Sequence, residues 1–313
     1  MEFADVEGAP TALERKLLAA DGVRTAVDLV ERCDAQVARI LGADGARVAA
    51  LRAAAGAHLV PVSARALLAR GDRHVASGFG PFDAALGGGC RRGALTELVG
   101  RAGAGKTQVC HMLCAACAAR GHASVYVDAE HTFRPERVRE MRGGDAGALE
   151  RVHKMGVGGC GELLAVLERG DVLAKVRATG ARLCVLDSVA ALARGDFVGR
   201  ADLIERQRWL ARAASALKRI AYEADVAVVV TNHVMADFSS GDDAFDAVTP
   251  ALGLTWYHAV TTRVVLDAAP DRGRRFATVA KAPDRPSGVE VDYAIGPAGL
   301  VDAAAGAADA APV

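Results

Sequence analysis

Short, continuously apolar runs alternate with stretches of helical periodicity through most of the chain after residue 76. Seven runs predict strands, at residues 95–99, 123–128, 182–187, 226–231, 260–267, 274–281 and 289–295. Four stretches predict helices, at residues 106–120, 134–142, 161–178 and 203–224. Apolar strands separated by helices are typical of a parallel sheet covered on both faces, and we expect the closely spaced later strands to be antiparallel. The pattern therefore predicts an α/β core with a mostly parallel central sheet.

The chain before and after this core has different patterns. Apolar residues in short groups, punctuated by Asp21-Gly22 and Gly42-Ala43-Asp44-Gly45, predict a small helical N-terminal domain over residues 1–58. A linker with Pro61 and Gly71 covers residues 59–75, and the core runs from 76 to 301. The Ala/Gly-rich tail, residues 302–313, has no apolar pattern that could bury it, so we expect it to be disordered.

Composition narrows the class of protein. The 313 residues are 51% hydrophobic and 4% aromatic, and the formal net charge is +0. Because no global field draws such a chain to DNA, any contact with nucleic acid must come from local patches. No apolar run approaches the roughly 20 residues of a membrane span, and the N-terminus has no secretory pattern, so we expect no membrane partner.

The seven cysteines are an odd number without framework spacing, which favours a reducing compartment. Cys110, Cys114 and Cys117 share one face of a predicted helix. A metal or redox pair is one interpretation of this stripe. We favour a core stripe, because cysteine is among the most buried residue types and no second pair accompanies it.

Residues 100–107 match the phosphate-loop pattern G-x-x-x-x-G-K-[ST], between a predicted strand and a predicted helix. Glycines let successive N–H groups turn toward phosphate oxygens, and the helix adds its positive end. Lys106 would reach the β- and γ-phosphates, and the Thr107 hydroxyl would bind Mg²⁺. The loop therefore predicts an ATP and Mg²⁺ site rather than a merely flexible segment. The expected nucleotide-binding residues here are Gly100, Arg101, Ala102, Gly103, Ala104, Gly105, Lys106, Thr107 and Gln108.

Polar residues follow three of the apolar strands. Asp187 ends one strand, where we expect it to support Mg²⁺ rather than only to cap a turn. Another strand ends in Asp128-Ala129-Glu130, which makes Glu130 the candidate base that activates water, with Asp128 the second choice and a helix-start acid the alternative. A third ends in Thr231-Asn232-His233, which could sense the γ-phosphate or form a plain turn.

Other stretches have specific sequences. Residues 128–137 read Asp-Ala-Glu-His-Thr-Phe-Arg-Pro-Glu-Arg, and residues 82–89 read Phe-Asp-Ala-Ala-Leu-Gly-Gly-Gly before the phosphate loop. With the order of elements, they resemble the RecA/RadA recombinase family over nearly the whole chain, including a helix-hairpin-helix N-domain. Residues 251–258 and 280–283 are most similar to the eukaryotic recombinase paralogues, especially the B type.

This resemblance implies a RecA-like P-loop ATPase in the nucleus with DNA-dependent ATP hydrolysis at protomer interfaces. It also implies Glu130 as the catalytic base, Arg137 near the adenine, and His258 as a γ-phosphate sensor. The self-assembling members of the family dock on a neighbour through a linker Phe-x-x-Ala strand, yet no Phe lies between Phe3 and Phe79.

Three substitutions at motif positions also argue against a self-polymerising recombinase. His233 stands where the family has Gln, Lys281 where filament-forming members have an Asp that helps cap a neighbour's ATP, and His131 where the family has Gly. We therefore expect an accessory paralogue with weak ATPase activity, working in homologous-recombination repair. Its partners would be other paralogues in a hetero-oligomer and the main recombinase filament. The alternatives are a self-filamenting strand-exchange recombinase, a non-catalytic scaffold gated by ATP and, more distantly, an unrelated P-loop kinase or transporter ATPase.

Two loops would face DNA in such a fold. The first, about 194–204, carries Arg194 and Arg200, which either bind phosphates or begin a solvated helix. The second, about 235–255, has four aspartates and no Lys or Arg, so it should repel the DNA backbone. We therefore expect single-stranded or branched DNA to bind weakly to the lone chain and better with partners. Trp256 and Tyr257 could stack on a base, but more often such residues close a core edge.

Overall fold

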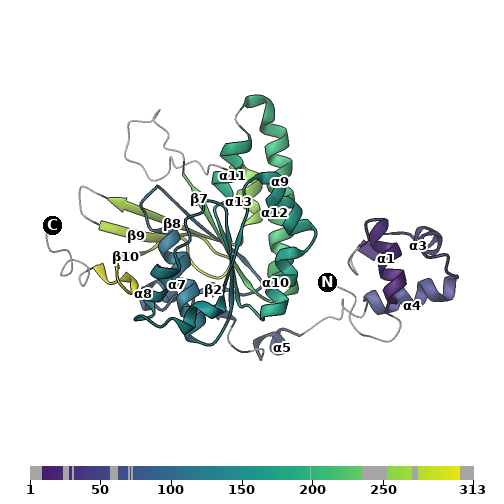
Figure 1. Ribbon diagram of the computed structural model, residues 1–313, viewed down its shortest axis with the longest axis horizontal. Helices are drawn as coiled ribbons and strands as arrows, with labels where there is room; N and C mark the ends of the chain where they lie inside the picture. The colour runs from purple at the N-terminus through teal and green to yellow at the C-terminus, as the bar shows by residue number, and fades with distance from the viewer. Residues whose placement is uncertain are drawn as a thin grey trace. The chain divides into compact units, whose positions relative to one another are not determined.

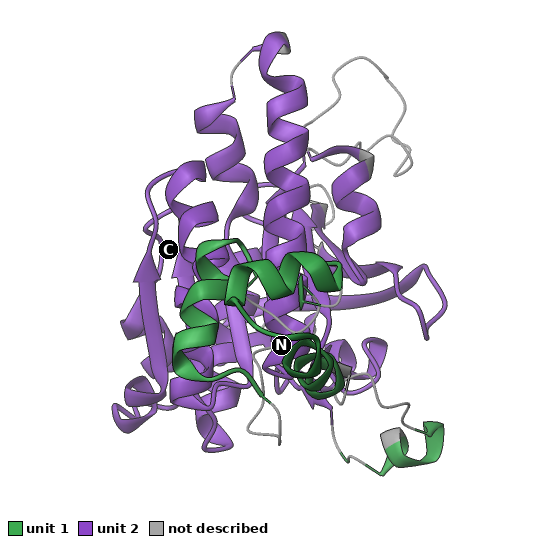
Figure 2. Ribbon diagram, turned by 90° about the vertical axis from the view of Figure 1, so that its right-hand side faces the viewer, with its two compact units in different colours: residues 1–72 green, residues 73–313 purple. Residues whose placement is uncertain are grey.

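The computed structural model describes residues 9–23, 28–29, 32–56, 63–69, 71, 73–197, 199–234, 252–269 and 274–303. The chain forms two compact units, which divide between Asp72 and Arg73 (Figure 2). Most of the predicted tail and the four aspartates of the second predicted DNA loop lie outside the described residues. In the described part of the chain, no helix is long and apolar enough to cross a membrane.

The first unit is helical. Its helices are α1 (Ala12–Ala20), α3 (Asp34–Leu41), α4 (Gly45–Gly56) and the short α5 (Ala64–Leu68), which falls inside the predicted linker. Thr11 and Glu14 form a capping box at the start of α1. Arg47 on α4 donates to both Glu14 carboxylate oxygens, at 2.7 and 2.8 Å, and these bonds lower the pKa of Glu14 to about 2. Because α1 and α4 are thereby joined, they enclose a small core of Leu18, Leu29, Val37 and Leu51.

The second unit is built on one large sheet, which has nine strands in the described residues. Its strands, in spatial order, are β11 (Gly299–Val301), β10 (Val289–Gly296), β9 (Arg274–Lys281), β8 (Thr262–Ala269), β3 (Leu95–Gly100), β7 (Ala227–His233), β6 (Leu183–Asp187), β4 (Ser124–Asp128) and β5 (Val152–Gly156). The strands from β8 through β3 to β5 are parallel, whereas β8, β9, β10 and β11 pair antiparallel. All seven predicted strands are present, and the predicted mostly parallel α/β fold is confirmed.

Helices cover both faces of this sheet (Figure 1). On one face lie α9 (Cys160–Glu168), α10 (Asp171–Thr179), α11 (Val189–Asp196), α12 (Leu203–Glu223) and α13 (Gly253–Ala259). On the other lie α6 (Gly80–Ala85), α7 (Lys106–Ala119) and α8 (Pro135–Met141). Val125 and Val127 of β4 enter the first core, whereas Tyr126 between them enters the second. This alternation, with apolar residues on both faces, explains why the strands read as continuous apolar runs.

Some predicted boundaries were wrong. The helix predicted over 161–178 is two helices, because Gly170 adopts a left-handed conformation (φ 86°) that ends one and begins the next. The strand β5 was missed, since it lies at the sheet edge and none of its residues is fully buried. The short helices α6, α11 and α13 were also missed. A separate two-stranded pair joins β1 (His74–Val75) to β2 (Cys90–Arg91).

The cysteine stripe of α7 belongs to the core. Cys110, Cys114 and Cys117 are buried and unpaired in disulfides, and burial raises the pKa of the Cys114 and Cys117 thiols to about 12. The described residues contain no group of three or more His, Cys, Asp or Glu side chains that could hold a metal ion. Because all three side chains lie in the buried cluster that includes α7, the core interpretation of this stripe is confirmed.

A buried carboxylate ties four elements together beneath the sheet's carboxyl edge. Glu97 of β3 is fully buried and accepts hydrogen bonds from Asn232 Nδ2 (2.8 Å), Trp256 Nε1 (2.8 Å) and Arg263 Nε (2.5 Å). These donors come from β7, α13 and β8. Trp256 is thus a core residue rather than a surface for stacking bases, and Tyr257 lies against the Arg263 guanidinium (4.6 Å).

We expect Arg263→Met to lower the free energy of unfolding of the second unit by about 3–5 kcal/mol, because Glu97 would remain buried without its cation. Urea unfolding followed by tryptophan fluorescence measures the loss. Arg212→Met is the matched control, since it removes the exposed pair with Glu168 and should leave the unfolding midpoint unchanged. Equal losses in the two variants would contradict the anchoring role of Glu97.

Candidate functional site

The phosphate-loop residues lie between β3, which ends at Gly100, and α7, which begins at Lys106. Two glycines are required by close packing. A Cβ on Gly100 would lie 2.1 Å from the Leu266 carbonyl oxygen. At Gly105 the backbone is left-handed (φ 100°), and a Cβ would lie 3.1 Å from Ile295. The predicted strand–loop–helix arrangement is therefore present, and its glycines allow the backbone to turn tightly.

Lys106 is held inside this loop. The residue is buried, with 7% exposure, and Nζ donates to the carbonyl oxygens of Gly100 (2.8 Å) and Arg101 (2.9 Å). Burial lowers the pKa of Lys106, and the carboxylates of Asp187 and Glu130 partly offset this effect. The ammonium group is thus positioned by weak neutral acceptors, which phosphate oxygens can replace with stronger, charge-assisted bonds.

Beside the loop lies a pocket of about 290 Å³. Its lining contains several predicted nucleotide-site residues, namely Ala102, Gly103, Gly105, Lys106, Thr107, Gln108, Glu130 and Asp187. Two further residues line the pocket: His233, from the strand end that we expected either to sense the γ-phosphate or to form a plain turn, and Ile295, which was not assigned to the nucleotide site from sequence. The fold thus gathers residues from the loop, the ends of three other strands and the C-terminal hairpin around one space.

Asp187 is the centre of a buried hydrogen-bond cluster. The carboxylate accepts from Thr107 Oγ1 (2.9 Å), Tyr126 OH (2.6 Å) and Thr231 Oγ1, and its residue is only 3% exposed. The two predicted metal ligands, Thr107 and Asp187, are therefore neighbours at the edge of the pocket. Both offer hard oxygen donors, and Mg²⁺ typically takes one or two protein oxygens together with phosphate and water. The donor set fits Mg²⁺.

Glu130 reaches the pocket from the turn after β4. Its Oε1 atom accepts a hydrogen bond from Ser188 Oγ and lies 3.1 Å from His233 Nε2. Among the described residues, Oε2 has no hydrogen-bond partner. The hydrogen bond from His233 is the main cause that lowers the pKa of Glu130 to about 2. The carboxylate is therefore ionised at neutral pH and held by one oxygen.

Asp128, the second choice for the base, is used differently. It is fully buried, accepts the backbone N–H groups of Thr132 (3.1 Å) and Phe133 (3.3 Å), and pairs with Lys154 at 3.1 Å. It stabilises the turn between β4 and α8 and is absent from the pocket lining. Of the two acids, only Glu130 lines the pocket.

The C-terminal hairpin of β10 and β11 supports the loop from behind. Tyr293 OH donates to the Ala104 carbonyl oxygen, and Ile295 lines the pocket. Arg137 of α8 donates to Gln108 Oε1 (2.8 Å) and to the carbonyl oxygens of Gly296 and Pro297 at the end of this hairpin. Nothing in the local sequence indicates these contacts, because they join residues that are 29 to about 190 positions apart.

The remaining predicted site residues lie elsewhere. His258 is exposed on α13 and does not line the pocket. Arg194 is exposed near the end of α11. Arg200 begins the 3-10 turn Arg200–Asp202, and its side chain lies outside the described residues. The structure therefore joins the phosphate and metal residues with Glu130, whereas neither His258 nor Arg194 lines their pocket.

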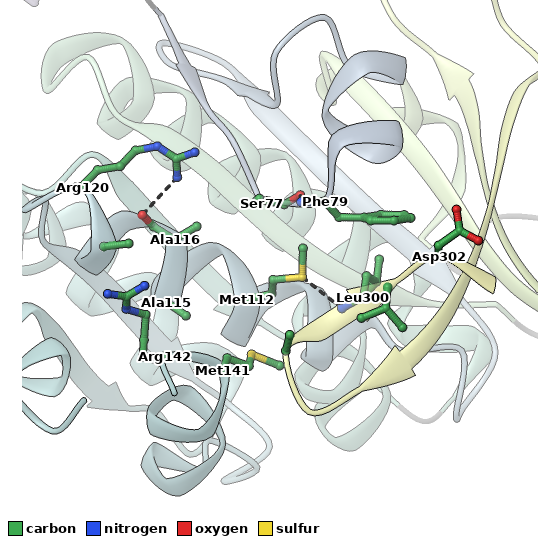
Figure 3. A pocket seen from close by; sticks show the side chains of 14 residues that line it. Ser77, Phe79, Met112, Ala115, Ala116, Arg120, Met141, Arg142, Leu300 and Asp302 are labelled. Carbon is green, nitrogen blue, oxygen red and sulfur yellow. Dashed lines mark hydrogen bonds between the residues drawn. The ribbon is translucent and has the colours of Figure 1, made fainter. Parts of the chain in front are cut away.

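A second, larger pocket shows that volume alone does not identify the site. It measures about 670 Å³ and lies along the outer side of α7, between Phe79, Met112 and Leu300 (Figure 3). Arg120 and Arg142 stand at one end of it. Its lining contains no phosphate-loop residue and neither Glu130 nor Asp187. The chemistry of the smaller pocket, rather than its size, makes it the candidate site.

A buried histidine lies directly behind the site. His111 of α7 stacks on Tyr126, with ring centroids 5.8 Å apart, and its Nε2 accepts the N–H of Arg134 (3.3 Å). Burial lowers the pKa of His111 from 6.5 to about 4. Between about pH 4 and pH 6.5, the folded chain therefore keeps this ring neutral, whereas an unfolded chain would protonate it.

This difference predicts acid sensitivity. Above pH 6.5 both states are neutral at His111, so there is no penalty. As the pH falls from 6.5 towards about 4, only the unfolded state takes up the proton, so the free energy of unfolding falls, by about 3 kcal/mol in full. In His111→Phe, which retains an aromatic ring, this part of the pH dependence should vanish. Unfolding midpoints measured from pH 4 to 8 would contradict the prediction if the two slopes were equal.

Comparison with known proteins agrees with this geometry. A family model described as Rad51 matches residues 73–303. The chain is 36% identical over 244 residues to the meiotic recombination protein DLH1 of Candida albicans, covering 73% of each chain. It is 36% identical over 244 residues to the DNA repair protein RAD51 of Mycosarcoma maydis, covering 73% of this chain and 69% of the relative. It is 32% identical over 320 residues to the Rad51 homolog of Drosophila melanogaster, covering 95% and 92%. The chain therefore belongs to the Rad51 family, within the RecA/RadA recombinases.

Proposed function

We propose that this chain binds Mg-ATP, hydrolyses it slowly with stimulation by DNA, and acts in the nucleus as an accessory subunit in homologous-recombination repair. The observation that carries the proposal is the meeting of Lys106, Thr107, Asp187 and Glu130 around one pocket. Members of the Rad51 family are DNA-dependent ATPases, and the names of the relatives describe DNA repair and meiotic recombination. Nuclear residence follows from such a role.

Each side chain has a distinct part in this proposal. Lys106 exchanges the carbonyls of Gly100 and Arg101 for phosphate oxygens, and Thr107 and Asp187 hold Mg²⁺, which would neutralise charge on the phosphates. Oε2 of Glu130, which has no partner in the described part of the chain, accepts a proton from the attacking water. Arg137 and Gln108, already bonded to each other, border the region for the adenine.

Slow turnover is consistent with the state of Glu130. A carboxylate with a pKa of about 2 is correctly ionised at pH 7, but it is a weak base. This observation also favours a second candidate, in which ATP binding only sets an interface and hydrolysis has no role. If hydrolysis is required, replacing Glu130 should impair repair; if ATP binding only sets an interface, the replacement should leave repair intact.

The accessory role is supported by Lys281. Its Nζ donates to the carbonyl oxygens of Tyr257 (2.8 Å) and Val260 (2.7 Å) at the end of α13, and it lies 4.8 Å from the Tyr257 ring. This lysine thus stabilises its own chain, where filament-forming members of the family have an aspartate for a neighbour's ATP. We propose that other paralogues of the recombinase complete a hetero-oligomer with this chain, in the manner of a B-type paralogue, and that the assembly supports the main recombinase filament. Residues 1–58 would serve as the helical N-domain and 59–75 as its linker.

DNA contacts are proposed for Arg194 and Arg200, each of which would add about one unit to the salt dependence of binding. The four aspartates of the second predicted loop would repel DNA phosphates and so weaken this binding. The lone chain should therefore bind single-stranded or branched DNA weakly, and partners would supply further cations.

Two substitutions separate binding from catalysis. Lys106→Ala should weaken ATP binding at least about tenfold, because it removes the cation that meets the phosphates. Glu130→Gln should leave binding nearly unchanged and reduce hydrolysis by about 10²-fold or more. Calorimetry with ATP and phosphate release with single-stranded DNA measure the two effects. Arg212→Ala, on the exposed face of α12, is the control. If Glu130→Gln retained full repair and assembly while Lys106→Ala lost both, the ATPase proposal would be wrong, and the non-catalytic scaffold gated by ATP would be the better description.

The state of assembly tests the accessory role. Light scattering of the purified chain with Mg-ATP should give a monomer or small oligomer, with or without single-stranded DNA. We expect this result because no Phe lies between Phe3 and Phe79 that could dock the chain on a neighbouring subunit. Long assemblies that require ATP and DNA would instead establish a self-filamenting recombinase.

A further inference from the structure

Tyr293 lies behind the phosphate loop and has no part in the function proposed above. It belongs to β10, it is only 1% exposed, and it does not line the nucleotide pocket. Its ring is in the same buried cluster as Leu98 of β3 and Val109 of α7. The hydroxyl donates to the carbonyl oxygen of Ala104 in the loop. Any influence of this side chain on a bound nucleotide must therefore pass through the loop.

The loop residue that accepts this bond is itself anchored. Ala104 is 1% exposed, and its side chain is in the same buried cluster as Tyr293. The tyrosine is held in turn by the sheet, because its backbone lies opposite Arg275 in the antiparallel pairing of β10 with β9. A buried phenol needs a hydrogen-bond acceptor, and here the loop supplies it. Ala104 is thus fixed both at its side chain and at its carbonyl group.

The bond sets the plane of the peptide that joins Ala104 to Gly105. This peptide is trans. It is therefore planar, and its C=O and N–H groups point in opposite directions. Because the carbonyl is held by Tyr293, the N–H of Gly105 points away from the hydroxyl. Gly105 lines the pocket, and its N–H has no protein acceptor in the described part of the chain.

Glycine alone would not maintain this direction. Gly105 has a φ of 100°, and a residue without a Cβ reaches many other backbone conformations at similar energy. If the peptide turned over, the Ala104 carbonyl oxygen would take the place of the N–H group. A carbonyl oxygen and a phosphate oxygen are both acceptors, so the turned peptide could not bind a phosphate. The tyrosine hydroxyl favours the orientation in which the donor remains available.

This bond differs from the bonds that Lys106 makes to the same loop. In the proposed function, Lys106 exchanges the carbonyls of Gly100 and Arg101 for phosphate oxygens, so those two bonds belong to the empty loop. A phosphate cannot donate to the Ala104 carbonyl in place of the tyrosine. The bond from Tyr293 is therefore compatible with both the empty and the occupied loop.

We infer that Tyr293 is a positioning residue for the phosphate loop, and that its hydroxyl raises the affinity for ADP and ATP alike by directing the Gly105 N–H towards the phosphates. The inference rests on the nucleotide binding proposed above. In phosphate loops the backbone N–H groups cradle the α- and β-phosphates, which the two nucleotides share. The orientation exists before the nucleotide arrives and serves substrate and product equally, so it acts on binding rather than on the hydrolytic step.

The test is Tyr293→Phe, which retains the ring and removes only the hydroxyl. In calorimetry with the full chain, Kd should rise about three- to tenfold for Mg-ADP and by the same factor for Mg-ATP, as expected for one hydrogen bond. KM for ATP should rise with it, while kcat with single-stranded DNA should change less than about twofold, because uniform binding is lost.

Val289→Ala is the matched control. Val289 lies at the other end of β10 and is partly buried against the same core, so its truncation weakens the packing of the strand without touching the loop. Its Kd values for both nucleotides should equal those of the unchanged protein. Circular dichroism at the temperature of each titration ensures that only folded protein is compared.

Three results would overturn the inference while leaving nucleotide binding intact. They are unchanged Kd values in Tyr293→Phe, an equal loss in Val289→Ala, and a loss confined to ATP, which would indicate an effect at the γ-phosphate. A fourth result, no binding of either nucleotide by the unchanged protein, would remove the proposed function together with the inference.

Discussion

The carboxylate of Asp187 is the interaction on which the site depends. A charged group that is almost fully removed from water is strongly destabilising unless hydrogen bonds replace its hydration. Here hydroxyls from Thr107, Tyr126 and Thr231 do so. They belong to α7, β4 and β7, so satisfying one carboxylate also fixes the start of the phosphate-loop helix against two neighbouring strands. The parallel arrangement makes this possible, because the carboxyl ends of β4, β6 and β7 meet at one edge of the sheet.

A second carboxylate, that of Glu97 on β3, is fully buried and also joins several elements through hydrogen bonds. It binds Asn232, Trp256 and Arg263, which fixes both described ends of the segment between β7 and α13 to the strand that leads into the phosphate loop. Because Asn232 precedes His233, the buried network determines where the last residue of β7 lies. The end of β7, which carries a pocket residue, and α13 thus share one buried support.

Glu130 illustrates a compromise between orientation and basicity. Hydrogen bonds from Ser188 and His233 to a single oxygen hold the carboxylate in place and leave the other oxygen without a partner among the described residues. The same bonds stabilise the ionised form and weaken it as a base.

Much of this architecture can be read from local sequence. The phosphate loop, seven of the nine described strands of the sheet and the acids at the ends of β4 and β6 were predicted, since a strand apolar on both faces and a glycine-rich turn are properties of adjacent residues. The break at Gly170 and the edge strand β5 were missed, because an isolated glycine is compatible with a helix and a half-exposed strand has no continuous apolar run. Glu130 was preferred to Asp128 from the sequence, and the structure shows how the two acids differ. Both acids follow the same strand, and only the packing shows that one binds the N–H groups of its own turn while the other reaches the pocket.

The sequence by itself determined the ligand class and the order of elements, while the tertiary structure decided which side chains meet. The contacts of Glu130 with His233, of Ala104 with Tyr293 and of Glu97 with Arg263 join residues 103, 189 and 166 positions apart. Periodicity along the chain reports only whether a residue is apolar and which face of its element it occupies. The partner across the sheet depends on the order in which strands pair, and that order is set by the hydrogen bonding and burial of the whole sheet at once.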